Sequence, residues 1–139
     1  MQKILLIVLF TPLVGFSKET NLYCKGSYSN TIDHKTDTYE RELNFSFDDK
    51  RKTFSTDNRL LCNDFNQIYP LKVTALSFSE SEIIFSHQND QREEGRCKSN
   101  FSLNRVSGNL TTLQIIGDIY NPAILIEGYY KCEIAKPKF

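Results

Sequence analysis

Short stretches in which apolar and polar side chains alternate follow one another along this chain, and this period of two constrains the fold most. Leu43, Phe45 and Phe47 alternate with polar residues, and so do Phe101 and Leu103. Successive side chains of a β-strand point to opposite faces, so the pattern predicts strands with one face in a core. Four further stretches place these residues on shared faces: Leu71, Val73 and Ala75; Ile83, Phe85 and His87; Leu113, Ile115 and Ile119; and Ile124, Ile126, Tyr130 and Cys132.

Clusters of turn-forming residues separate these stretches. They are Asp48-Asp49-Lys50, Ser79-Glu80-Ser81, Ser107-Gly108-Asn109 and Asn121-Pro122. Links of this length join antiparallel neighbours, because parallel strands need a much longer crossover connection. We therefore expect an all-β fold, a single antiparallel meander of about seven to eight strands that forms a small barrel or a sandwich.

The start of the chain has the three parts of a secretory signal peptide. Lys3 supplies a positive charge, residues 4–10 are an uninterrupted apolar run, and the small residues Gly15 and Ser17 precede the expected cleavage point. The apolar stretch is shorter than the ~20 residues that a membrane span needs. We expect residues 1–17 to be a removable signal peptide. Residues 18–139 should then form one β-rich domain, periplasmic or secreted, with no membrane span in the mature chain.

The four cysteines are widely and almost evenly spaced at Cys24, Cys62, Cys97 and Cys132. Export to an oxidising compartment favours disulfides, whereas zinc sites take their ligands in close pairs, so we expect no metal site. Closing the sheet into a barrel would place the first strand, with Cys24, beside the last strand, with Cys132. Of the three possible connectivities we favour Cys24 with Cys132 and Cys62 with Cys97.

Charge and histidine content argue against two classes of function. The chain has 17 basic and 17 acidic residues, so it lacks the basic footprint of a nucleic-acid-binding protein. His34 and His87 are its two histidines, and the sequence contains neither a metal-binding histidine pair nor a Gly-x-Ser-x-Gly nucleophile motif. We expect His34 to lie in a polar loop and His87 to pack on the apolar face of its strand. The sequence therefore predicts no catalytic residues, no cofactor and no enzymatic activity.

The two longest polar links, residues 29–38 and 88–95, are expected to be exposed loops, and binding residues concentrate on such loops. The candidate binding-loop residues are Asp33, His34, Lys35, Arg92 and Glu93.

The segment from Asn104 to Asn109 reads as a hairpin turn. Gly108 can take the positive φ that a tight turn needs, and Asn104 can bond neighbouring backbone groups. Arg105 beside this turn is a candidate polar anchor for a carboxylate or a phosphate, although a cross-strand ion pair is the commoner fate of such a residue.

Several motifs resemble those of a loose group of small exported bacterial proteins of unassigned function. They are residues 22–26 (LYCKG), 101–110 (FSLNRVSGNL) and 128–132 (GYYKC), with a basic end at residues 136–139. The hairpin motif in that group is Asn-Arg-aliphatic-Thr/Ser-Gly, and Ser107 stands where threonine is commoner. The resemblance implies a β-rich periplasmic or secreted bacterial protein, and it brings no activity with it.

Three functions remain open. The first is a non-enzymatic binding or interaction protein that uses its surface loops, with an unknown protein or small ligand as partner. The second is a lipocalin-like carrier of a small apolar ligand, which needs a hollow barrel. Bulky phenylalanines inside a small barrel favour a filled core, so they disfavour this function. The third is a small hydrolase that uses His34, and the sequence supports it least.

Overall fold

The structure is a computed structural model that describes residues 19–56, 71–74, 76–89, 96–117 and 122–135. The expected signal peptide, Cys62, Arg92 and Glu93 lie outside the described residues, so the predictions made for them stay predictions. Within the described ranges, the structure contains no helix that is long and apolar enough to span a membrane.

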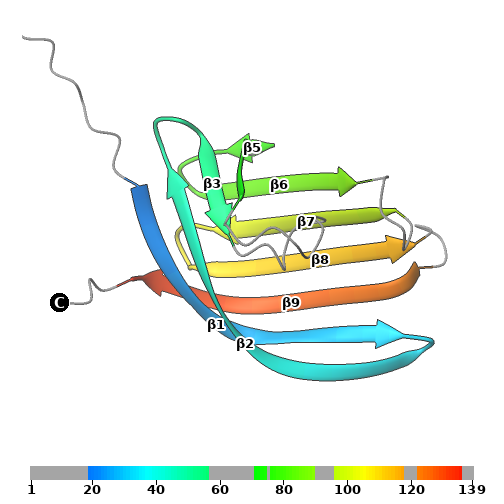
Figure 1. The fold of residues 1–139 in the computed structure, drawn as a ribbon. Coiled ribbons are helices and arrows are strands. Elements are labelled where there is room, and N and C mark those ends of the chain that lie inside the picture. The colour runs from blue at the N-terminus through cyan, green and yellow to red at the C-terminus, as the bar shows by residue number, and fades with distance from the viewer. Residues whose placement is uncertain (1–18, 57–70, 75, 90–95, 118–121, 136–139) are drawn as a thin grey trace, which may run out of the picture.

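One antiparallel sheet contains all nine strands of the described ranges (Figure 1). The strands are β1 (Glu19–Ile32), β2 (Lys35–Asp48), β3 (Thr53–Thr56), β4 (Leu71–Thr74), β5 (Ser77–Phe78), β6 (Glu82–Asn89), β7 (Cys97–Asn104), β8 (Asn109–Gly117) and β9 (Pro122–Ile134). Their order across the sheet is β4-β3-β2-β1-β9-β8-β7-β6-β5. The first strand thus lies beside the last, and the expected all-β antiparallel meander is confirmed.

The seam between β1 and β9 places Cys24 opposite Cys132. These two cysteines form a disulfide, with their Cα atoms 4.0 Å apart, which confirms the favoured pairing. Cys97 is disulfide-bonded as well, and its expected partner Cys62 lies outside the described residues. Gly26 allows β1 to approach β9 closely, because a Cβ at this position would lie 2.0 Å from the carbonyl oxygen of Tyr129.

The sheet curls into a half-barrel whose two edges approach each other at one end (Figure 1). The edge strand β4 ends at Thr74 and the opposite edge strand β5 begins at Ser77. Three residues of extended chain span at most about 11 Å, so these two edges must lie close together at that point. The described strands form a single curled sheet, and this resolves the choice between a barrel and a sandwich that the sequence leaves open.

Phenylalanine rings from both walls of the half-barrel meet inside it. Phe54 of β3 stacks on Phe45 of β2, with ring centroids 5.3 Å apart. The same ring meets Phe85 of β6 and Phe101 of β7 edge-on, at 4.6 and 5.3 Å. Edge-to-face pairs of this kind add stabilisation beyond the buried area. The buried core around these rings also contains Leu22, Leu43, Phe47, Ile83, Leu103, Leu110 and Tyr130, as the alternation predicts for most of them.

The buried face of β8 differs from the expected one. Thr112, Gln114 and Ile116 are buried together with Leu110, whereas Leu113 and Ile115 lie half-buried on the opposite face. Leu110 fixes this choice, because it pairs in register with Leu103 of β7 and Tyr130 of β9, both of which are in the core. A period of two then carries every second residue after Leu110 to the inner face, polar or not.

Candidate functional site

The candidate binding residues Asp33, His34 and Lys35 lie at the end of a long β-hairpin. β1 and β2 pair without interruption from Glu19 opposite Asp48 to Ile32 opposite Lys35. Asp33 and His34 form the two-residue turn, with φ of 48° and 64°. Positive φ at both central residues is the geometry that matches the twist of a hairpin. The expected loop over residues 29–38 is therefore wrong: these residues are two paired strands around a tight turn, although the turn is exposed as expected.

The inner face of the half-barrel continues from the core onto this hairpin. On β1, Tyr28, Asn30 and Ile32 share a face with the buried Cys24, because side chains alternate along a strand. On β2, Tyr39 lies opposite Tyr28, and Arg41 lies opposite Gly26. On β9, Ile126 and Ile124 lie opposite Asn30 and Ile32. We call this surface the hairpin face, and its residues are Tyr28, Ile32, Tyr39, Arg41, Ile124 and Ile126.

The aromatic part of the hairpin face is ordered by its own contacts. The rings of Tyr28 and Tyr39 stack with their centroids 5.3 Å apart. The guanidinium carbon of Arg41 lies 3.7 Å from the centroid of the Tyr28 ring, a cation–π contact. Ile32 and Tyr39 are nevertheless 44% and 47% exposed. The hairpin therefore presents apolar and aromatic surface, next to a fixed positive charge, outside the core.

Two polar groups lie on the inner face beside the hairpin face. The Oδ1 atom of Asn30 is buried and has no hydrogen-bond partner among the described residues. An unsatisfied buried acceptor costs about 1–3 kcal/mol, so Asn30 is suited to accept a hydrogen bond from a bound group.

The second polar group is the Tyr130 hydroxyl. Burial raises the pKa of this hydroxyl above its ordinary value, while the nearby Arg41 guanidinium favours the ionised form.

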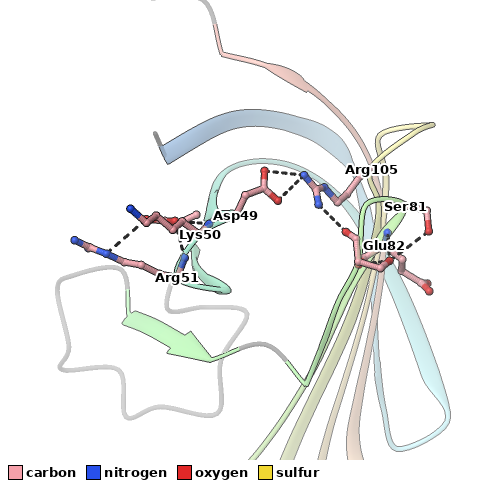
Figure 2. A network of polar contacts seen from close by, with 8 residues as sticks. Asp49, Lys50, Arg51, Ser81, Glu82 and Arg105 are labelled. Atoms are coloured by element: carbon pink, nitrogen blue, oxygen red, sulfur yellow. Dashed lines mark hydrogen bonds and ion pairs between the residues drawn. The ribbon is translucent and has the colours of Figure 1, made fainter. Parts of the chain in front are cut away.

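Arg105, the candidate polar anchor, is held by a carboxylate of the protein itself (Figure 2). Its Nη2 atom lies 2.9 Å from each carboxylate oxygen of Asp49, and its Nη1 atom donates to the carbonyl oxygen of Ser79 at 2.6 Å. The guanidinium carbon also lies 4.7 and 5.3 Å from the ring centroids of Phe47 and Phe78. Because Asp49 follows β2 and Arg105 follows β7, these contacts hold the two walls of the half-barrel together.

The turn that presents Arg105 has the local structure that its sequence predicts. The Oδ1 atom of Asn104 accepts hydrogen bonds from the backbone N–H groups of Val106 and Ser107, at 3.0 and 2.8 Å. Gly108 has φ of 73°, and its carbonyl accepts a hydrogen bond from the backbone N–H of Cys132 at 2.7 Å. The turn is thus bound directly to the disulfide-bearing strand.

The two histidines lie in different parts of the sheet. His34 is exposed in the β1–β2 turn. His87 is on β6 and shares the face of Ile83 and Phe85 as expected, with its ring nearly parallel to that of Phe85 at 6.2 Å. Within the part of the chain that the structure describes, no three His, Cys, Asp or Glu residues are grouped so that they could hold a metal ion.

Sequence reasoning did not identify Tyr39 and Arg41 as candidate site residues. The signal was the alternation of Leu43, Phe45 and Phe47, which places Arg41 and Tyr39 on the same face when it is extended toward the start of β2. Both residues stand in a stretch of polar side chains just after the expected loop over residues 29–38, and the predicted alternation begins only at Leu43.

Comparison of the chain with protein-family models, curated proteins and solved structures finds no match. The function is therefore inferred from the arrangement of the side chains.

Proposed function

We propose that this protein is an exported, non-enzymatic binding protein that captures a partner protein through the hairpin face. The observation that carries this proposal is the exposure of Ile32 and Tyr39 beside the ordered pair of Tyr28 and Arg41. A partner that presents aliphatic or aromatic side chains would remove this apolar surface from water.

The residue types of the hairpin face and the restricted conformations of their side chains support binding. Tyrosine and arginine are enriched among the few residues that supply most of the energy of a protein interface. The stacking of Tyr28 on Tyr39 and the contact of Arg41 with Tyr28 restrict these side chains in the free protein, so less conformational entropy is lost on binding. Asp33, His34 and Lys35 at the turn supply the charged rim that surrounds the apolar centre of many interfaces.

Export is part of the same proposal. The Cys24–Cys132 disulfide supports it, because disulfides form and persist in oxidising compartments. The mature protein should begin at Lys18, after the small residues Gly15 and Ser17. N-terminal sequencing of the protein from the periplasm or the culture medium tests this, and a chain that still begins at Met1 would contradict it.

Site-specific photo-crosslinking in living cells tests the binding surface. A photoreactive amino acid replaces Ile32 in one variant and Ile84 in the matched control. Both are partly exposed isoleucines, but Ile84 lies on the outer face of β6, opposite to the buried Ile83 and Phe85. We expect a covalent adduct with a distinct protein from position 32 and none from position 84. Adducts of equal yield from both positions, or from position 84 alone, would exclude the hairpin face as the binding surface.

A further inference from the structure

The strand β2 has a long outer edge that none of the described strands covers. One side of β2 pairs with β1 along its whole length, but on the other side β3 pairs only with Phe45 to Asp48. The backbone from Lys35 to Asn44 is therefore an open edge within the described residues. An open edge is a template for a further strand, and natural proteins interrupt such edges with proline, bulges or repelling charges. This stretch contains no proline.

Symmetry limits how two copies of β2 can pair along this edge. An antiparallel pair of identical strands has a twofold axis perpendicular to the sheet, so one residue of each copy meets its own counterpart at the axis. Residues directly opposite each other then lie on the same face of the joined sheet. Each register is therefore defined by its central residue, and the side chains that it brings together follow from the sequence alone.

Charge selects one register among those centred on residues 37 to 41. Four of these registers place like charges opposite each other. A centre at Asp37 pairs two aspartates, and a centre at Thr38 places Lys35 opposite Arg41. A centre at Glu40 pairs two glutamates, and a centre at Arg41 pairs two arginines. Like charges directly opposite each other destabilise a sheet. A centre at Tyr39 instead places Asp37 of each copy opposite Arg41 of the other, and it places each Tyr39 opposite its own counterpart in the other copy.

We propose that two copies of this protein pair antiparallel through the outer edge of β2, with Tyr39 on the twofold axis. The contact runs from Lys35 to Leu43 in each copy, with two Asp37–Arg41 ion pairs flanking the aromatic pair. Opposite-charge and aromatic cross-strand pairs each stabilise a sheet. The dimer does not depend on the proposed capture of a partner, and it joins the two hairpin faces on one side of a continuous sheet.

Charge reversal tests this register. Sedimentation equilibrium of the mature protein should show a dimer, and Asp37→Arg and Arg41→Asp should each weaken it roughly tenfold or more, because both ion pairs become repulsive. An equimolar mixture of the two variants restores both ion pairs between unlike chains, so it should dimerise about as tightly as the unaltered protein. Glu40→Lys is the matched control, since Glu40 faces Thr38 in this register and should change the affinity by less than about threefold.

A second measurement is independent of the charges. Tyr39→Cys places one cysteine opposite its own copy, at a separation that a disulfide can bridge. Non-reducing electrophoresis should show a covalent dimer for this variant and none for Thr38→Cys. A monomer at all concentrations, a mixture of charge variants that fails to dimerise, a Glu40→Lys effect as large as that of Asp37→Arg, or no crosslink at position 39 would each overturn the proposal.

Discussion

The Arg105 guanidinium lies 2.9 Å from both carboxylate oxygens of Asp49, a residue 56 positions away in the sequence, and this contact joins the two walls of the half-barrel. Arg105 also bonds the Ser79 carbonyl and covers the rings of Phe47 and Phe78, so most of its contacts do not involve Asp49.

Arg105→Ala should therefore lower the free energy of unfolding by about 1–2 kcal/mol, the sum of a lost hydrogen bond and a lost cation–π contact. Asp49→Ala should cost less than about 1 kcal/mol, because the Asp49 side chain is 54% exposed and solvent weakens its ion pair. Urea unfolding measures both values, with Arg51→Ala as the control for an exposed arginine. Equal losses from Arg105→Ala and Asp49→Ala would show that the ion pair alone holds the walls together.

Gly108→Ala should destabilise the hairpin that presents Arg105. Gly108 has a positive φ, and a Cβ there would lie 2.4 Å from the carbonyl oxygen of Cys132. Strain of this kind costs about 1–3 kcal/mol. Val106→Ala in the same turn is the control, because Val106 is exposed and should change stability by no more than about 0.5 kcal/mol. If thermal unfolding gives the same result for both variants, the backbone of Gly108 is not under this constraint.

The seam between the first and last strands was predictable because barrel-like closure and the positions of Cys24 and Cys132 led to the same pairing. The buried faces of β2, β6 and β7 were predictable for a similar reason, since large apolar residues such as Phe45, Phe85 and Phe101 recur at every second position.

Other features were beyond the reach of the sequence. The sequence predicts a loop at the hairpin end, because a strand exposed on both faces lacks the alternation of apolar and polar residues that marks a half-buried strand. The inner face of β8 contains Thr112 and Gln114, so the alternation that includes Leu113 and Ile115 predicts the wrong buried face for this strand. The partner of Arg105 depends on how the sheet curls, and no local pattern specifies a contact between residues so far apart.

Replacing Cys24 and Cys132 together with alanine should lower the free energy of unfolding by about 4–5 kcal/mol, because the disulfide closes a loop with a sequence separation of 108. That loss is comparable to the whole net stability of a small domain. Urea unfolding of this double variant against the unaltered protein measures it. A loss below about 1 kcal/mol would show that the strand pairing holds the seam without the disulfide.

Stability at alkaline pH should depend on Tyr130. Burial raises the pKa of its hydroxyl above the ordinary value of 10.0, so the folded state favours the neutral form. The corresponding contribution to stability is fully present below pH 10.0 and is lost as the pH rises through the pKa of the folded state. Tyr130→Phe should therefore lose less stability than the unaltered protein above that pH, whereas Tyr129→Phe, at an exposed position, should follow the unaltered protein. Parallel curves for all three proteins would contradict the effect of burial.

The affinity for the crosslinked partner tests the role of the hairpin face most directly. Ile32→Ser removes apolar surface from the hairpin face, and because Ile32 lies on β1 this change does not alter the outer edge of β2. Ile84→Ser makes the same change on the outer face of β6. Calorimetric titration of the purified partner should show at least a tenfold weaker Kd for Ile32→Ser, the loss expected at the centre of an interface, and a change of less than about twofold for Ile84→Ser. An unchanged Kd for Ile32→Ser, or an equal loss in both variants, would contradict binding through the hairpin face.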